Sequence, residues 1–174
     1  MSKDEMLPFE PKFCTKKPRW PAGPWHNEPD LRAFDVLGLR CAVIRHPKLG
    51  HLCGYVHVPP GHPLDGVLCG DRVKIPLAYL KFPQNPRTYL PLFFNENNEP
   101  EVEVPLNWAL QVHGCVTYSE HTVDGSWFGF DCNQLGDLAP GNIHSGGDYR
   151  DWEYVVGETE MLAEQLAAWP GVAG

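Results

Sequence analysis

The feature that most constrains the fold is the pair Asp124-Gly125, which lies between two runs of strand-forming residues. The run before it, 112–119, reads VHGCVTYS, and the run after it, 126–132, reads SWFGFDC. Asp-Gly between two such runs is among the strongest local signals for a two-residue hairpin turn. We therefore expect an antiparallel β-hairpin over 110–133.

The position of the turn sets the expected pairing of the two strands. With Asp-Gly at the turn, Thr122 would lie near Trp127 and Tyr118 near Asp131. A shift of the register by one residue would instead bring His113 and Asp131 together. In the first register, the two faces of the hairpin would carry Gly114, Val116, Tyr118, Trp127, Gly129 and Asp131 on one side, and His113, Cys115, Thr117, Phe128, Phe130 and Cys132 on the other.

A second hairpin is expected earlier in the chain. The runs LRCAVIRH (39–46) and HLCGYVHVP (51–59) are apolar and rich in β-branched residues, and a short PKLG sequence joins them. Proline early and glycine late in a four-residue connection are typical of a turn. Another strand is expected to begin near Val102 or Leu110 and to run through Ser119 into the Asp-Gly hairpin.

One amphipathic helix is predicted over 149–168. Its apolar residues recur at spacings of three and four, which is the stripe of a helix that covers a core. Asp148 or Ser145 is the expected N-cap, and Pro170-Gly171 would end the helix. The residues expected to pack on the sheet are Trp152, Val155, Leu162 and Leu166.

The fold class that follows is α+β, an antiparallel sheet of hairpins with one C-terminal helix on a face. Prolines divide the chain further, because proline lacks a donor and fixes φ. Residues 1–30 hold six prolines and form a proline-rich arm, docked through Trp20 and Trp25 or loose. We expect a single domain over 31–174 with a loop-rich insertion over about 60–100 that holds one short strand at 88–94.

Charge and hydropathy exclude several classes of partner. The 174 residues carry 14 Lys and Arg against 22 Asp and Glu, for a formal net charge of -8. The only basic group is Lys16, Lys17 and Arg19, so nucleic-acid binding is not expected. No run approaches the roughly 18 apolar residues of a membrane span, and the first residues show no secretory leader. We expect a cytoplasmic protein.

The cysteines and histidines predict neither disulfides nor a metal site. None of the six cysteines forms a CxxC pair, so we interpret all six as reduced thiols. No HExxH or CxxC spacing is present, so we expect no metal and no cofactor. A metal site would have to draw three or four ligands from His57, His113, Asp131, Asp137 and His144.

Three segments carry a resemblance. Residues 112–119, 127–132 and 149–155 read VHGCVTYS, WFGFDC and YRDWEYV, and they resemble a family of small uncharacterised proteins of bacteriophages and prophages. The family's pattern reads roughly HGGLTYS, then WFGFDCAH, one residue and GD, then a C-terminal helix. Cys115 stands here at the second glycine and Gln134 at the histidine. The resemblance implies a phage origin and a fold, and phage accessory proteins often act against host defence.

The function we expect is binding of a small polar ligand, such as a nucleotide, that serves as a host defence signal. Aromatic rings would stack on the ligand, and histidines and carboxylates would bind its polar groups. The glycine-rich segment 141–148 and the helix N-terminus would receive a phosphate. The expected ligand-binding residues are His57, His113, Tyr118, Trp127, Asp131, Asp137, His144 and Tyr149.

Two other functions stay open. A hydrolase would use His113 and Asp131 as general base and orienter, which requires both on one face. A protein-protein inhibitor of a host factor would use its surface alone, and self-association into a homo-oligomer is compatible with each reading. His113 and Asp131 could equally serve the fold as hydrogen-bonded structural groups. A nucleophile pair of Cys132 and His113 is disfavoured, because a catalytic thiol needs an electropositive, partly open setting.

Overall fold

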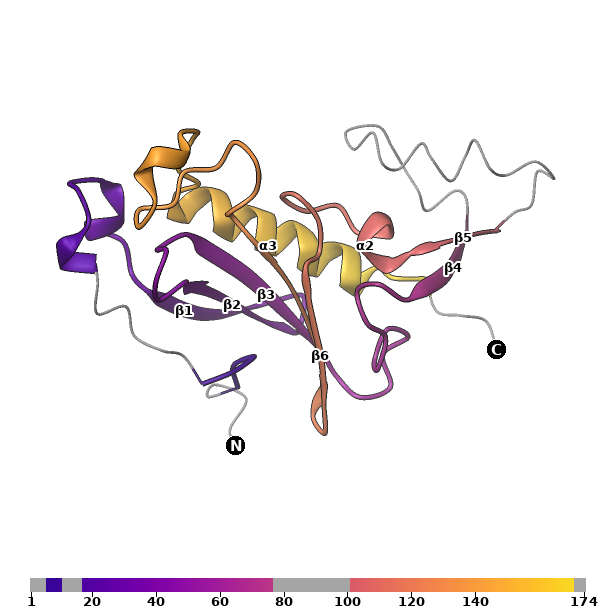
Figure 1. The fold of residues 1–174 in the computed structure, drawn as a ribbon. Helices are drawn as coiled ribbons and strands as arrows, with labels where there is room; N and C mark the ends of the chain where they lie inside the picture. The colour runs from indigo at the N-terminus through magenta and orange to yellow at the C-terminus, as the bar shows by residue number, and fades with distance from the viewer. Residues whose placement is uncertain (1–5, 11–16, 77–100, 171–174) are drawn as a thin grey trace.

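A computed structural model describes residues 6–10, 17–76 and 101–170. Its main element is a five-stranded antiparallel sheet with strand order β1-β2-β3-β7-β6. A long helix crosses one face of this sheet, and a separate two-stranded sheet, β4-β5, lies near the end of that helix (Figure 1). The strands are β1 (Leu31–Val36), β2 (Leu39–Arg45), β3 (Leu52–Val58), β4 (Arg72–Pro76), β5 (Glu101–Pro105), β6 (Tyr118–Thr122) and β7 (Gly125–Asp131), and the α-helices are α2 (Leu106–Ala109) and α3 (Trp152–Ala167).

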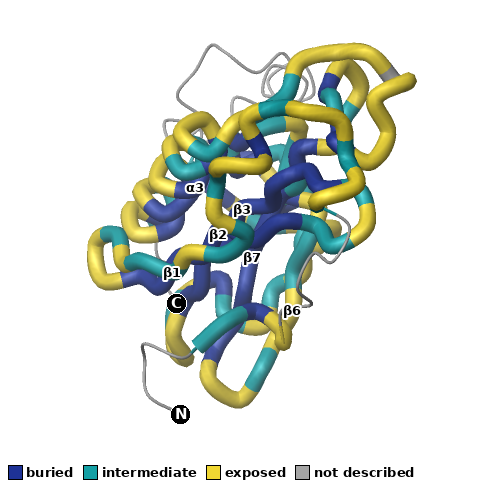
Figure 2. Tube along the Cα trace, turned by 90° about the vertical axis from the view of Figure 1, so that its left-hand side faces the viewer, coloured by how far each residue is buried: buried dark blue, intermediate teal, exposed yellow. Residues whose placement is uncertain are grey.

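The α+β class and the first hairpin are confirmed. β2 and β3 pair antiparallel, and every residue of both strands is buried, as expected for apolar runs at the centre of a sheet covered on two sides. Figure 2 shows β2, β3 and β7 as the buried middle of the molecule, whereas β6 lies at the edge. β1 completes the other edge and was not predicted.

The amphipathic helix is confirmed as α3, which packs on β3 and β2. Its N-cap is Asp151, whose side chain accepts a hydrogen bond from the backbone N–H of Tyr154, so the expected cap at 145 or 148 was too early. A Cβ at Gly54 would lie 2.2 Å from Oγ1 of Thr159, so the missing side chain in β3 is what allows α3 to approach so closely. The buried stripe of α3 consists of Val155, Thr159, Leu162, Ala163 and Leu166.

The second hairpin forms, but its predicted register is wrong by two residues. Thr122 pairs with Gly125 and Tyr118 with Gly129, so the two loop residues are 123 and 124. Gly125 belongs to the strand, where a Cβ would lie 2.1 Å from the carbonyl oxygen of Val58 and where φ is +124°. The glycine is therefore required by the neighbouring strand. A two-residue shift keeps the paired residues of both strands on their predicted faces, but Val116, expected beside Tyr118 and Trp127, packs in the core with Phe128 and Phe130.

The strand expected to begin near Val102 or Leu110 and to run through Ser119 is divided, because β5 ends at Pro105 and β6 begins only at Tyr118. β5 and α2 occupy 101–109, and the segment 110–117 runs beside α3 without strand pairing. Side chains of α3 bond to this backbone instead. The amide of Gln165 accepts from the N–H of Gln111 at 2.7 Å and donates to its carbonyl at 2.6 Å, and Glu158 accepts from the N–H of His113 at 2.6 Å. These bonds replace those of a β-ladder.

The arm docks on the sheet through its described residues. Trp25 is buried and lies within the 3₁₀ turn η3 (Pro24–His26). Trp20 directly follows the 3₁₀ turn η2 (Lys17–Arg19), and its ring lies against Gly50. Met6 and Leu7 pack on the face of the sheet that α3 does not cover. The expected strand at 88–94 lies outside the described residues.

Two further findings concern the described part of the chain. No helix there is long and apolar enough to cross a membrane. The cysteines within it form no disulfide: Cys41, Cys53, Cys69, Cys115 and Cys132 are all free thiols.

Candidate functional site

The structure places His113 next to the buried carboxylate of Asp137. Nε2 of His113 lies 2.6 Å from Oδ2 of Asp137, whose side chain is 1% exposed. His113 belongs to the segment beside α3, and Asp137 to the loop that follows β7. Two of the predicted ligand-binding residues are thus in contact, although the sequence analysis had considered Asp131 as the partner of His113.

Asp137 accepts hydrogen bonds on both carboxylate oxygens. Nε of Arg150 donates to Oδ1 at 2.9 Å, and the backbone N–H of Gln134 donates to Oδ2 at 2.9 Å. Burial opposes ionisation of Asp137, but the hydrogen bonds from His113, Arg150 and Gln134 outweigh it and hold the pKa of this carboxyl below its ordinary value. Asp137 is therefore a carboxylate that orients the imidazole of His113.

Tyr154 extends this pair into a chain of hydrogen bonds. Because a carboxylate only accepts, Nε2 of His113 carries the proton that faces Asp137. Nδ1 of the neutral ring is then an acceptor, and the hydroxyl of Tyr154 lies 2.9 Å from it. Burial and the charge of Glu158 raise the pKa of Tyr154, so its hydroxyl stays protonated. This hydroxyl donates a hydrogen bond to Nδ1. The chain runs from Tyr154 through His113 to Asp137.

The chain of hydrogen bonds ends at a pocket of about 340 Å³ between the segment 111–114 and α3. Tyr154 and Glu158 lie four residues apart on α3, and both line it. The ring of Tyr154 stands edge-on to His113 and is covered by the guanidinium of Arg150, 5.1 Å from its centroid. We call this the His113 pocket, and its lining residues are Gln111, Val112, His113, Gly114, Tyr154, Glu158 and Met161.

Tyr149 belongs to a different polar cluster, centred on the buried Arg45. The hydroxyl of Tyr149 donates to Glu28 at 2.5 Å and accepts from Nη1 of Arg45 at 2.9 Å. Nη2 and Nε of Arg45 donate to Glu28 and Asp30 at 2.8 Å each, and Nη1 donates to the carbonyl of Gly50. This Arg45 cluster connects the arm, the sheet and the loop before α3. The hydroxyl of Tyr149 is used within the cluster, so its proton is not offered to a ligand.

Three other predicted residues lie within the sheet. Trp127 is 2% exposed, and the ring of His57 packs on it at 5.0 Å. Tyr118 packs edge-on against Tyr55, and its hydroxyl donates to the carboxylate of Glu120. Since Trp127 exposes almost no surface, it cannot stack on a ligand as the sequence analysis expected.

Asp131 and His144 are not among the described hydrogen-bond partners of the His113–Asp137 pair. Asp131 accepts from the hydroxyl of Thr117, the backbone N–H of Asn133 and the amide of Gln134, at 3.0 to 3.2 Å. These bonds occupy both of its oxygens, which is the structural role the sequence left open. His144 is exposed in the 3₁₀ turn η6 (Ile143–Ser145).

The helix N-terminus does not offer the phosphate site that the sequence analysis expected. A carboxylate oxygen of Glu28 accepts from the N–H of Trp152 at 3.1 Å, and Asp151 accepts from the N–H of Tyr154 at 2.9 Å. Two of the N–H donors at the positive end of the helix dipole are therefore used by carboxylates of this chain. A phosphate there would meet two negative charges.

A trio of Ser126, His121 and Asp65 has the composition of a hydrolytic triad but not its geometry. The hydroxyl of Ser126 donates directly to Asp65 at 2.8 Å and accepts from the N–H of Gly66. The same ring nitrogen, Nδ1 of His121, faces both Ser126 at 3.1 Å and Asp65 at 3.2 Å. A triad instead requires the imidazole to bridge the other two groups through two different nitrogens. The trio fastens the loop at 65–66 to β7.

Neither metal binding nor thiol chemistry gains support within the described residues. No three of their His, Cys, Asp and Glu side chains converge to hold a metal ion. Cys132 is buried, and burial together with the charge of Asp137 raises the pKa of its thiol, so it is protonated at neutral pH.

Tyr154, Glu158 and Arg150 were not predicted from the sequence. A usable signal was present, because Arg150, Tyr154 and Glu158 recur every four residues, and Tyr154 and Glu158 share one polar side of the helix that begins just after Arg150. The sequence contained no sign that this side faces His113, because the two segments are 41 residues apart.

Comparison with known proteins identifies no relative, since no protein-family model, no curated protein and no solved structure matches this chain.

Proposed function

We propose that the chain binds a small polar ligand in the His113 pocket. The observation that carries the proposal is the buried Asp137, which holds the imidazole of His113 at 2.6 Å while Tyr154 and Glu158 line a pocket of about 340 Å³. Ligand sites are commonly hollows of roughly 300 Å³ or more with a few polar groups in fixed positions. Hydrogen bonds from both sides fix the orientation of this imidazole.

The charges around the pocket favour an uncharged or cationic ligand over an anion. The carboxylate of Glu158 lines the pocket, and Asp137 lies directly behind His113. The nearby cation, Arg150, is already paired with Asp137. The ring of Tyr154 offers an edge or face to a flat ligand, and Glu158 accepts hydrogen bonds from its amino or ring N–H groups. A nucleobase or nucleoside meets these requirements better than a nucleotide.

The phage resemblance stays a prediction, and it supplies the biological part of the proposal. If the chain acts against host defence, the ligand would be a base-containing host signal that the protein sequesters. Sequestration requires that the ligand leave the protein unchanged, which separates this role from catalysis.

A depletion experiment tests the proposal. The full chain is incubated with a panel of nucleobases, nucleosides and nucleotides, the bound fraction is separated, and heat-denatured protein is analysed for released compounds. We expect intact base or nucleoside in the released fraction, with the corresponding phosphates held more weakly. Depletion of no compound in the panel would contradict binding of this ligand class.

Matched variants assign any binding to the pocket. Glu158→Gln removes the pocket carboxylate, whereas Glu160→Gln removes an exposed carboxylate two residues further along the same helix. We expect at least tenfold weaker binding for the first and unchanged binding for the second, with equal thermal midpoints. Equal binding by both variants would place the ligand elsewhere.

A second candidate function is hydrolysis of the same ligand, and the His113–Asp137 pair is the observation in its favour. Asp137 would orient the ring and stabilise its protonated form, and Nδ1 would accept a proton from water once Tyr154 moves away. The carboxylate that orients His113 in this candidate is Asp137 and not Asp131, the partner expected from the sequence. Altered ligand in the released fraction would support hydrolysis over sequestration.

A further inference from the structure

The face of the sheet opposite α3 holds a second cavity, of about 370 Å³, between the N-terminal segment and strands β2 and β3. Its floor consists of Ile44, Cys53 and Tyr55, and Ile44 and Cys53 are paired residues on adjacent strands. Phe9 forms one wall, with its ring edge-on to that of Tyr55 at 5.4 Å. Pro47 and Glu10 complete the rim.

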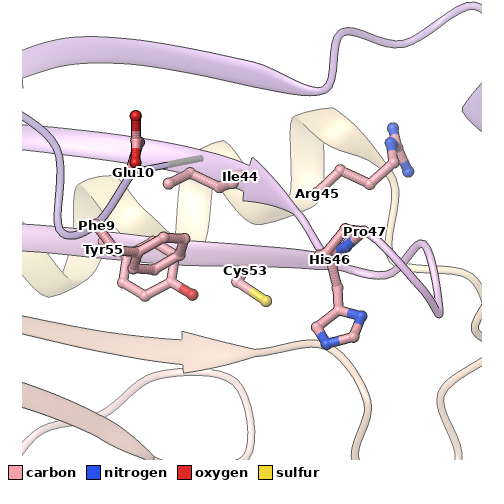
Figure 3. A pocket seen from close by; sticks show the side chains of 8 residues that line it. All are labelled: Phe9, Glu10, Ile44, Arg45, His46, Pro47, Cys53 and Tyr55. Atoms are coloured by element: carbon pink, nitrogen blue, oxygen red, sulfur yellow. The ribbon is translucent and has the colours of Figure 1, made fainter. Parts of the chain in front are cut away.

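The two ends of the cavity differ in chemistry. Figure 3 shows Phe9 and Tyr55 together at one end, Cys53 in the middle and His46 at the other end. The guanidinium of Arg45 points away from these side chains in the same view, toward the carboxylates of its own cluster. Among the described residues that line the cavity, Glu10 on the rim carries the charge that faces it.

The polar end is a stack of two neutral imidazoles. The rings of His46 and His51 lie 4.7 Å apart and nearly parallel. Nδ1 of His46 accepts from the backbone N–H groups of Lys48 and Leu49, so the proton of the neutral ring is on Nε2. Within the described chain, neither Nε2 of His46 nor the buried Nδ1 of His51 has a hydrogen-bond partner. Burial lowers the pKa of both rings, that of His51 to about 4.

The middle of the cavity is chemically inert. Burial raises the pKa of the Cys53 thiol to about 12, so the sulfur is neutral and a poor nucleophile. Burial likewise raises the pKa of the Tyr55 hydroxyl, so it also stays neutral. This site is therefore suited to hold a molecule and not to modify one.

We propose that this cavity binds an uncharged aromatic molecule of about two fused rings. An apolar cavity of about 150 Å³ holds one benzene ring, so a cavity of about 370 Å³ has room for two rings. Phe9 and Tyr55 offer the edge-to-face contacts that aromatic rings prefer. A hydrogen-bond acceptor on the ligand fits the imidazole end, where Nε2 of His46 carries a proton.

Quinoline is a suitable probe, because it is a flat, neutral, two-ring molecule with one ring nitrogen that accepts a hydrogen bond. The full chain, labelled with ¹⁵N, is titrated with quinoline and followed by NMR. We expect saturable shifts centred on Ile44, Cys53 and Tyr55, with a dissociation constant of about 1 mM or tighter, as is usual for so small a ligand.

Variants locate the site. Cys53→Met fills the floor of the cavity and should weaken quinoline binding at least tenfold, and Phe9→Ala removes an exposed wall residue and should weaken it several-fold. Cys69→Met is the same substitution at a half-buried cysteine outside the cavity and should leave binding unchanged. Thermal midpoints establish that each variant folds, and Phe9→Ala keeps the test decisive if Cys53→Met does not.

Three results would overturn the proposal. Quinoline could cause no saturable shifts in the folded protein. Cys53→Met and Phe9→Ala could both bind it like the parent chain. The shifts could centre on His113 and Tyr154, and a His113→Gln variant could lose them, which would assign quinoline to the His113 pocket and leave this cavity without a ligand.

Discussion

Two clusters of polar side chains meet near the start of α3, and they differ in what they leave unused. In the Arg45 cluster, the guanidinium is fully buried and bonds to Glu28, Asp30, Tyr149 and the carbonyl of Gly50. In the His113 pocket, the corresponding chain of hydrogen bonds ends at Tyr154, which is 36% exposed beside an open pocket. Tyr149 belongs to the Arg45 cluster, and the next residue, Arg150, bonds to Asp137 behind the His113 pocket.

The difference separates a structural cluster from a binding site. In the Arg45 cluster, each donor that points inward meets an acceptor of this chain, so the cluster stabilises the fold and offers no group to a ligand. In the His113 pocket, the buried half is equally well bonded, but the outer half presents a phenol and a carboxylate to solvent. Both clusters contain an ion pair with at least one buried side chain, so an ion pair alone does not identify a site.

The largest expected effect is on stability, from loss of Arg45. Arg45→Met leaves Glu28 and Asp30 without their shared cation, and breaking a buried pair from one side costs about 3–5 kcal/mol. Urea unfolding measures this loss, and Arg32→Met at an exposed arginine of β1 serves as control. A loss under about 1 kcal/mol, the range of a surface ion pair, would mean that the cluster does not hold the arm to the sheet.

Loss of the Asp137 charge should have the next largest effect, and this effect should depend on pH. Because the folded-state pKa of Asp137 lies below its ordinary value of about 3.9, the carboxylate stabilises the folded state above that pH. This stabilisation is lost as the pH falls through the lower, folded-state value. Asp137→Asn, which cannot titrate, should cost about 2–3 kcal/mol at neutral pH.

The check is the difference in unfolding free energy between the parent chain and Asp137→Asn, measured at neutral pH and again below about pH 3.9. The difference should shrink on acidification, since the parent loses its advantage. A difference that is the same at both pH values would mean that the charge of Asp137 contributes nothing to the folded state.

A matched pair of tyrosine variants gives the smallest effect on stability and the sharpest contrast between the clusters. Tyr149→Phe removes a hydroxyl that bonds to Glu28 and Arg45, and it should cost about 1–2 kcal/mol while ligand depletion is unchanged. Tyr154→Phe removes a hydroxyl at the pocket, and it should change stability by less than about 0.5 kcal/mol while depletion falls.

Thermal unfolding and ligand depletion, measured on both tyrosine variants, test the contrast. If Tyr149→Phe reduced depletion as strongly as Tyr154→Phe, the two clusters would form one functional unit. If Tyr154→Phe were the less stable variant, the outer half of the His113 chain would be structural as well.

The correctly predicted elements are those whose signal is local. The runs around PKLG and around Asp-Gly and the stripe of α3 each depend on residues within about 20 positions, and each element formed. The register of the second hairpin was wrong because Gly125 was assigned to the turn. Its lack of a side chain is required by Val58 on a neighbouring strand, which no local pattern reveals.

The candidate site was only partly predictable for the same reason. His113 and Asp137 were both named as ligand-binding residues, because histidines and carboxylates can bind the polar groups of a ligand. Their pairing was not foreseen, nor was the burial of Trp127 or the use of Tyr149 by Arg45. The Arg45 cluster could have been expected from the sequence, since an arginine inside an apolar strand must find charged or hydrogen-bonding partners.

By itself, the sequence determined the α+β class, the two predicted hairpins and the C-terminal helix, because backbone propensity and side-chain periodicity act over a few residues. Only the tertiary structure decided that side chains of α3 would bond to the backbone at 111 and 113 and so prevent a strand there. It also decided which carboxylate meets His113. Hydrogen bonds between distant segments depend on how the helix packs on the sheet, and this packing depends on the whole core, including a glycine at position 54.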